Sequence, residues 1–152
     1  MTDDIDRIME VMAAAFDPTF REAWNRRQVE DALKFGNSHY CLVNEEGEWP
    51  QDDEPTAGFW LSRTGFEEEE LLLLGVSPAF RRKGLGRNLL RKLQGGANER
   101  CVKRLLLEMR RGNPAESLYR SCGFYSIGER RDYYLTTSGQ RIDAITFACD
   151  LA

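Results

Sequence analysis

The sequence predicts a mixed α/β fold, with a mostly antiparallel, mixed β-sheet and helices on both of its faces. Two segments with helical spacing of apolar residues come first, and segments with strand composition follow them. Later in the chain, two helical segments are each enclosed by strand segments, as in strand–helix–strand units. The chain has 152 residues, a usual length for one domain, so we expect a single domain over residues 1–152.

Two helices are predicted at the N-terminal end. Apolar residues between positions 5 and 16 recur every three or four residues, aspartates precede them as cap signals, and Pro18 follows them. A second helix is expected to begin at Asn25, because Gln28 completes a capping box with it. We expect Gly36 to end this helix.

Three strands are predicted next. Residues 39–44 and 56–64 are rich in β-branched, aromatic and other apolar side chains, and an acidic, proline-containing loop separates them. The run Glu69–Val76 contains four consecutive leucines and therefore predicts a strand buried on both faces.

The second half of the chain alternates helices and strands before it closes with a strand pair. Asn113 is suited to cap the second of these helices, with Pro114 at the first helical position and Glu116 completing a capping box. In order, we expect helix 84–97, strand 103–109, helix 114–122, and strands 125–134 and 141–150 around a turn at 138–139.

Charge is distributed unevenly along the chain, whose net charge is −4. Residues 1–80 contain 18 acids and 6 bases (−12), residues 81–111 contain 2 acids and 11 bases (+9), and residues 112–152 contain 5 acids and 4 bases (−1). A basic segment within an acidic chain favours one anionic ligand at one place, whereas a nucleic-acid-binding protein is more often basic throughout. The alternative is a solvated helix face rich in arginine.

The basic segment includes a glycine-containing turn between a predicted strand and a predicted helix. Glycine lets the backbone approach a ligand closely, and the free N–H groups of a first helical turn bind phosphate oxygens. The turn is not a Walker A loop, and Leu89 occupies the third glycine position of a dinucleotide fingerprint. We therefore expect a phosphate-binding turn formed by Arg81, Arg82, Lys83, Gly84, Leu85, Gly86 and Arg87.

Other residues indicate the compartment and exclude some kinds of site. The four cysteines lack Cys-x-x-Cys spacing and favour reduced thiols. The N-terminal segment is too acidic for a secretory signal, and no apolar run is long enough to span a membrane, so we expect a cytoplasmic protein. His39 has no second ligand at metal spacing, and no metal is expected.

These motifs resemble those of the GNAT acetyltransferase superfamily. Arg81, Gly84 and Gly86 match its Arg/Gln-x-x-Gly-x-Gly/Ala signature. Residues 106–124, which include Leu-Glu-Met-Arg and Leu-Tyr-x-x-x-Gly-Phe, are similar to ribosomal-protein alanine N-acetyltransferases. The pair Tyr133-Tyr134 also matches their closing segment, and the resemblance covers roughly residues 67–150.

The resemblance implies a fold in which a central parallel strand pair separates to admit acetyl-coenzyme A. It implies that Leu74, Gly75, Val76 and Asn113 bind the cofactor together with the turn at 81–87, with a bulge at Gly75 and the Val76 N–H at the thioester carbonyl. It also implies Glu108 as the base and Tyr119 as the acid of a direct transfer. Without the resemblance, Glu108 is an exposed or ion-paired strand residue and Tyr119 is a core residue.

The acidic balance of residues 1–80 favours a cationic acceptor, such as the N-terminus of a basic protein. The resemblance implies that this acceptor is the N-terminal α-amine of a ribosomal protein. A lysine side chain, a polyamine and an aminoglycoside are alternatives within the same superfamily. A non-catalytic coenzyme A-binding module and nucleic-acid binding are alternatives from other classes, and the sequence leaves the oligomeric state open.

Overall fold

A six-stranded sheet with the order β1-β2-β3-β4-β6-β5 forms the centre of the structure, a computed structural model that describes residues 3–151. Within these residues β3 and β4 run parallel, and all the other neighbouring strands are antiparallel. The predicted fold class is therefore confirmed. The strands are β1 (Ser38–Val43), β2 (Gly58–Thr64), β3 (Glu68–Val76), β4 (Arg104–Arg110), β5 (Tyr125–Leu135) and β6 (Arg141–Asp150).

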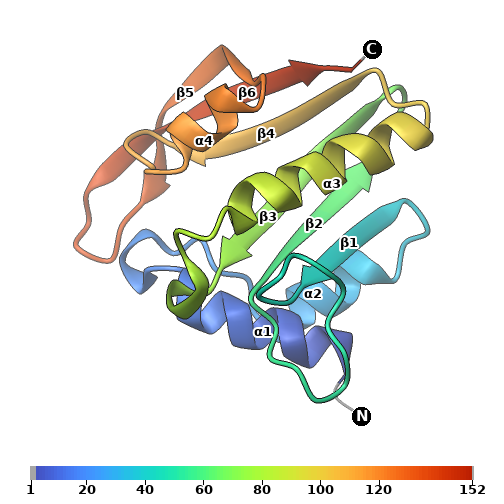
Figure 1. Cartoon of the computed structure of the whole chain (residues 1–152). Coiled ribbons are helices and arrows are strands. Elements are labelled where there is room, and N and C mark those ends of the chain that lie inside the picture. The colour runs from blue at the N-terminus through green and yellow to red at the C-terminus, as the bar shows by residue number, and fades with distance from the viewer. Residues whose placement is uncertain (1–2, 152) are drawn as a thin grey trace.

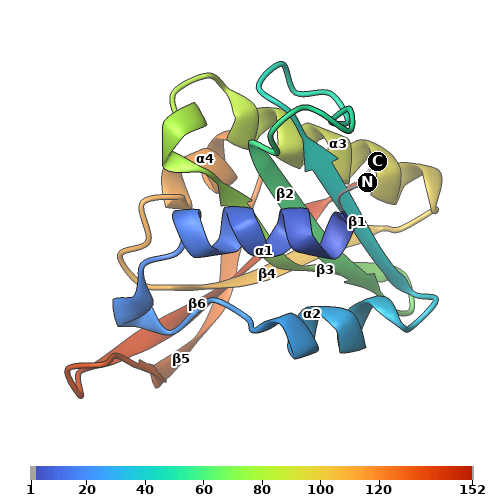
Figure 2. The ribbon, with the colours of Figure 1, turned by 90° about the horizontal axis from the view of Figure 1, so that it is seen from below.

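Helices cover both faces of the sheet, as Figures 1 and 2 show. Helices α1 (Asp4–Ala15) and α2 (Arg26–Leu33) pack on one face, where their apolar residues form a cluster with β1, β2 and β3. Helices α3 (Leu85–Glu99) and α4 (Glu116–Ser121) pack on the other face over a second cluster. None of the helices in residues 3–151 combines the length and the apolar character needed to span a membrane.

The start signals of the first two helices are confirmed. Asp3 accepts a hydrogen bond from the backbone of α1, and the capping box of Asn25 and Gln28 is complete at the start of α2. The end predicted at Gly36 is wrong, because α2 ends at Leu33. The Ser38 hydroxyl donates to a backbone carbonyl of the last turn, so a side chain supports this helix end.

The fourth helix begins later than predicted. Asn113 Oδ1 accepts from the Ala115 N–H at 2.9 Å, which forms a capped turn, but regular helix starts only at Glu116. The expected capping box is absent, since the Glu116 carboxylate instead pairs with Arg120. The strands lie within two residues of their predicted bounds, and the turn before β6 contains Gly139 in the left-handed region at φ 86°.

Candidate functional site

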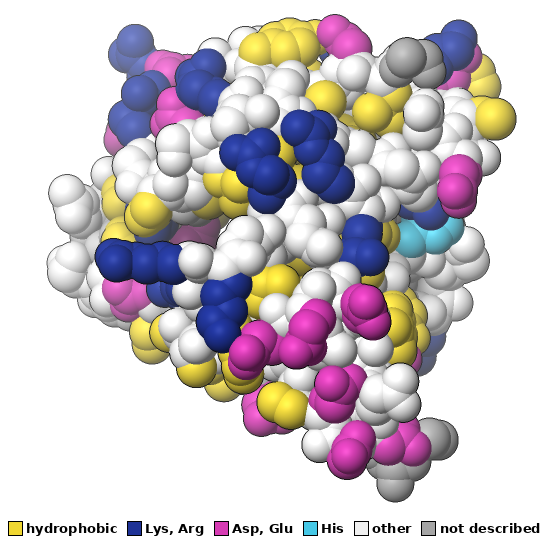
Figure 3. Space-filling model, viewed as in Figure 1, with side chains coloured by type: hydrophobic (Ala, Val, Ile, Leu, Met, Phe, Trp, Pro, Cys, Tyr) yellow, Lys and Arg dark blue, Asp and Glu magenta, His cyan; other side chains and the backbone are white. Residues whose placement is uncertain are grey.

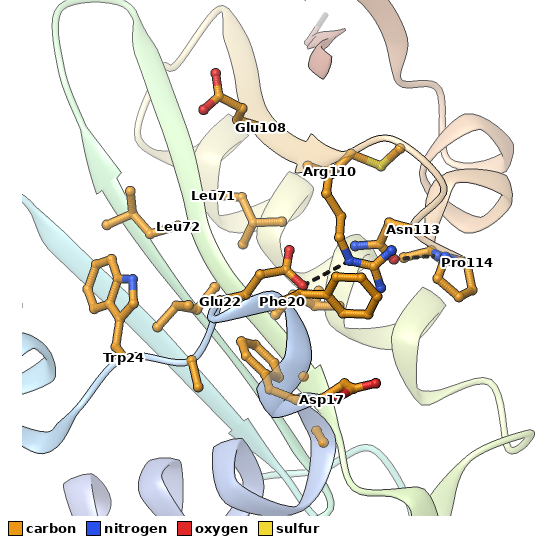
Figure 4. Close-up of a pocket in the computed structure, with 18 of the residues that line it drawn as sticks. Asp17, Phe20, Glu22, Trp24, Leu71, Leu72, Glu108, Arg110, Asn113 and Pro114 are labelled. Atoms are coloured by element: carbon orange, nitrogen blue, oxygen red, sulfur yellow. Dashed lines mark hydrogen bonds and ion pairs between the residues drawn. The ribbon is translucent and has the colours of Figure 1, made fainter. Parts of the chain in front are cut away.

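The parallel strands β3 and β4 separate partway along their length. Their pairing ends at Leu71 with Leu107, although β3 continues to Val76 and β4 to Arg110. The separated ends enclose a cavity of about 940 Å³, hereafter the cleft. Figure 4 shows that the loop after α1 and both strands contribute side chains to it, and residues of α4 and β5 complete its walls.

A bulge shapes the β3 side of the cleft. Leu72 is an extra residue opposite the step between residues 61 and 62 of β2, so Leu72 and Leu73 both contact the core cluster on the α1 side. The bulge expected at Gly75 is therefore misplaced, because Gly75 pairs regularly with Phe59. A Cβ atom at Gly75 would lie 3.0 Å from the Phe16 ring and 3.2 Å from the Phe59 ring, so close packing is the reason for glycine here.

The end of β3 presents backbone groups to the cleft. The Ser77 N–H donates to the carbonyl of Ala57, the residue just before β2, and alternation along the strand then directs the polar backbone groups of Val76 and Leu74 away from β2. The Val76 carbonyl accepts from Arg81 Nε at 3.1 Å instead of from the sheet. Arg81 Nη2 also donates to the Ala15 carbonyl at 3.1 Å, so this arginine joins the end of α1 to the end of β3.

The predicted phosphate-binding turn has unpaired backbone donors. Arg82 and Gly84 lie in the left-handed region at φ 66° and 76°, and the first helical hydrogen bond runs from the Asn88 N–H to the Gly84 carbonyl. The N–H groups before Asn88 therefore have no partner within the helix, and they lie at its positive end. The turn borders a second cavity of about 310 Å³. Such a concave array of amides fits the oxygens of a diphosphate.

The cations of the turn have different surroundings. Lys83 Nζ lies 2.9 Å from a carboxylate oxygen of Glu45, in the acidic loop between β1 and β2. Arg87 donates to the Ser121 hydroxyl at 3.0 Å and so links α3 to α4. Arg82 is exposed. The turn therefore combines fixed cations with cations that can reorient toward an anion.

The structure brings Glu108 and Tyr119 to the same cleft. Glu108 faces away from the core residue Met109, and its Oε2 accepts a weak hydrogen bond from Thr146 at 3.4 Å. The same oxygen lies 3.3 Å from Arg130 Nε, and 22% of the Glu108 side chain is exposed.

Tyr119 lines the cleft and is buried. Its ring packs edge-on against Phe124 with 5.8 Å between centroids. Burial, and to a smaller extent the charge of Glu22, raises the pKa of the Tyr119 phenol. The hydroxyl therefore carries its proton at neutral pH. Asn113 also lines the cleft, next to the start of α4.

One ion pair in the cleft was not predicted from the sequence. Arg110 Nε donates to Glu22 Oε1 at 3.2 Å, and the Arg110 guanidinium lies 3.6 Å from the centroid of the Phe20 ring. Burial raises the pKa of Glu22, and Arg110 opposes that rise. Figure 4 shows the Glu22 carboxylate directed toward Arg110, with Glu108 apart from this pair.

A second tyrosine adds to this side of the cleft. Burial, together with the charges of Glu22 and Glu108, raises the pKa of Tyr134 to about 12. One sequence signal points to Tyr134, the paired tyrosines of the closing segment. No sequence signal points to Glu22, because neither its local pattern nor its distance along the chain from Arg110 marks the pair.

Comparisons with known proteins agree with this geometry. Residues 8–124 match the family described as Acetyltransferase (GNAT). The chain is 40% identical over 97 residues to the [ribosomal protein bS18]-alanine N-acetyltransferase of Escherichia coli K12, an alignment that covers 63% of this chain and 65% of that protein. The chain thus spans just under two thirds of the length of the curated relatives it matches first.

Solved structures share the fold over nearly the whole chain. The crystal structure of the E. coli ribosomal-protein-S18-alanine N-acetyltransferase has a TM-score of 0.83 and 29% identity, covering 100% of this chain and 90% of that chain. Arabidopsis thaliana NAA60 in complex with acetyl-CoA has a TM-score of 0.76 and 18% identity, covering 97% of this chain and 93% of that chain. The fold is therefore one that occurs with acetyl-CoA bound.

Proposed function

We propose, because this chain belongs to the acetyltransferase (GNAT) family, that it transfers an acetyl group from acetyl-coenzyme A to the N-terminal α-amine of a protein. The observation that carries the proposal is the separation of β3 from β4 beyond Leu71, next to a turn of unpaired amides. A carboxylate and a buried phenol share the resulting cleft.

The cofactor would lie along the open edge of β3. The backbone groups of Leu74 and Val76 that point away from β2 would bind its amide-containing arm, with Gly75 between them paired to β2, and the Val76 N–H would polarise the carbonyl of the acetyl group. The amides of the turn at 81–87 would bind the diphosphate, with Arg82 and Lys83 adding charge and Asn113 a polar contact. When bound, acetyl-coenzyme A supplies the acetyl group as an activated thioester.

Two side chains would carry out the proton transfers of the reaction. Glu108 would accept a proton from the amine at its carboxylate, directly or through water, and the Tyr119 hydroxyl would donate a proton to the departing sulfur. Burial raises the pKa of Tyr119, so the phenol is protonated at neutral pH, as a proton donor must be. An α-amine with a pKa of about 7.7–8.0 is roughly a tenth unprotonated at pH 7, against less than a thousandth for lysine. A carboxylate is thus a sufficient base for an α-amine.

The acceptor is proposed as the N-terminus of a basic protein. The relative from E. coli acts on the alanine of ribosomal protein bS18. Figure 3 shows acidic side chains gathered over the region of the 45–55 loop and the start of α1, whereas basic side chains gather over α3 and the preceding turn. A basic protein would be attracted to the acidic region and the anionic cofactor to the basic one.

The test is transfer from acetyl-coenzyme A to synthetic peptides, followed by release of free thiol and by mass spectrometry. We expect an alanine-starting basic peptide to gain one acetyl group at its α-amine, and to react faster than an acidic peptide in low salt. Equal rates of transfer to basic and acidic peptides would contradict the proposal that the acceptor is a basic protein. Acetylation only of lysine side chains or of small amines would overturn the α-amine proposal.

A further inference from the structure

We propose that Glu22 is a specificity-determining residue of the acceptor site, with its Oε2 accepting a hydrogen bond from the incoming amine. This inference rests on the proposed function. It adds a second carboxylate to the cleft, one that holds the amine while Glu108 receives the proton.

The geometry leaves one oxygen of Glu22 available. Glu22 Oε1 accepts from Arg110 Nε at 3.2 Å, and within residues 3–151 Glu22 forms no other hydrogen bond. A carboxylate has about four lone-pair sites, so Oε2 retains its capacity to accept. In Figure 4 this carboxylate lies between the loop after α1 and the end of β4, at the cleft.

The carboxylate is also held in place before any ligand binds. The side chains of Glu22 and Arg110 are only 25% and 13% exposed. Arg110 is in turn fixed by its contact with the Phe20 ring, 3.6 Å from its guanidinium carbon. A carboxylate fixed in this way loses little freedom when it binds an amine, and partial burial strengthens its attraction for a positive charge.

Two carboxylates make this part of the cleft suited to an amine. Glu22 and Glu108 both line its wall, and each uses one oxygen for an arginine, Glu22 for Arg110 and Glu108 for Arg130. Glu22 also acts on the reactive centre, because its charge contributes to the raised pKa of both Tyr119 and Tyr134. A positively charged amine, or one that becomes positive as it attacks, is stabilised at this position.

The two carboxylates differ in what they already contact. The oxygen of Glu108 that points toward β6 and β5 is engaged by Thr146 and by Arg130. Glu22 instead reaches the cleft from the α1 side, which is the side opposite the phosphate-binding turn and α4. An acceptor entering from that side meets Glu22 before it reaches the end of the cofactor.

The test is binding of two peptides to the protein saturated with coenzyme A, measured by calorimetry. One peptide starts with alanine, and the other carries a propionyl group in place of that alanine, so that only the amine is missing. We expect the wild type to prefer the amine peptide by about 10- to 100-fold, as for a hydrogen bond to a charged group. Glu22→Gln should remove most of the preference for the amine peptide and leave coenzyme A binding unchanged.

The control is Glu68→Gln, which breaks a Glu–Arg pair of 2.7 Å at the far end of the same parallel strands. It should keep the full preference, and so should Glu108→Gln if Glu108 only receives the proton. If Glu22→Gln does not fold, Glu22→Asp, which withdraws the oxygens by one methylene, should show a partial loss.

A Glu22→Gln protein that retains the wild-type preference would overturn this inference alone. A wild type that binds neither peptide would overturn the proposed function and the inference together. A wild type that binds both peptides equally would show that no carboxylate recognises the amine, and it would also overturn the inference.

Discussion

The two walls of the cleft present different kinds of chemical group, one mainly backbone and the other mainly side chains. One wall, the proposed cofactor wall, is formed by the end of β3 and the turn at 81–87 and offers mainly backbone N–H groups. The other, the proposed acceptor wall, offers side chains, those of Phe20, Glu22, Arg110 and Tyr134. Its central ion pair joins residues 88 positions apart in the sequence.

This difference determines how each wall responds to substitution. Backbone donors survive most changes of side chain, so the cofactor wall is sensitive only where the backbone conformation itself depends on the residue. The acceptor wall loses a contact whenever one of its side chains is shortened or neutralised. We therefore expect the acceptor wall to diversify readily and the cofactor wall to be robust.

The largest expected effect is a loss of turnover on substitution of Glu108 or Tyr119, which line the cleft between the two walls. Glu108→Gln and Tyr119→Phe each remove a proton-transfer group, so we expect turnover to decrease roughly 10²–10⁴-fold in each variant. Coenzyme A affinity should be nearly unchanged, because neither group belongs to the cofactor wall. Steady-state kinetics together with calorimetry measure both quantities, and full turnover in both variants would contradict the assignment.

The acceptor wall should also depend on its ion pair for stability. Arg110→Met leaves the half-buried Glu22 without its partner, and we expect the free energy of unfolding to decrease by about 1–3 kcal/mol at pH 7. Arg104→Met is the matched control, since it breaks a more exposed Glu–Arg pair and should cost less. Urea unfolding measures both losses.

The loss of stability in Arg110→Met should also depend on pH. Burial holds the pKa of Glu22 above its ordinary value near 4.5, and the loss of Arg110 removes the group that opposes this rise. A carboxyl with a raised pKa in the folded state destabilises the fold once it ionises, and this penalty disappears as the pH falls through and below about 4.5. The stability gap between wild type and Arg110→Met should therefore narrow in acid; a gap independent of pH would exclude Glu22 as its cause.

The same contrast explains what could be predicted from the sequence. The fold and the position of the glycine-containing turn at 81–87 were predictable, because periodicity, caps and a contiguous motif act over short distances. Glu22 was not, since only the three-dimensional fold brings it to Arg110. The misplaced bulge and the early end of α2 have a related cause: both depend on tertiary contacts, of Leu72 with the core and of Ser38 with the last helical turn.

The cofactor wall should be sensitive to backbone conformation. Gly84 has φ 76°, where a β-branched residue is strained by about 1–2 kcal/mol. If Gly84→Val shifts the turn to relieve this strain, the amides lose their alignment, and we expect coenzyme A affinity to fall roughly 5- to 30-fold. Gly139→Val is the control, because Gly139 has a similar φ of 86° in the turn before β6. Gly139→Val should lower the stability of the fold as much as Gly84→Val does, but it should leave the affinity for coenzyme A unchanged. An equal loss of affinity in both variants would show that the loss comes from general destabilisation of the fold.

The smallest effects should come from exposed side chains of the cofactor wall. Lys83 pairs with Glu45 at 2.9 Å, and both side chains are nearly half exposed, at 44% and 47%. A phosphate of the cofactor must compete with Glu45 for this lysine. Lys83→Ala should therefore weaken coenzyme A binding by about two- to fivefold, and Glu45→Gln should strengthen it by a similar factor. Both changes should vanish in about 1 M salt, where the screening length is about 3 Å. Changes of the same sign in the two variants would mean that Lys83 and Glu45 support the loop together, instead of Glu45 competing with the cofactor.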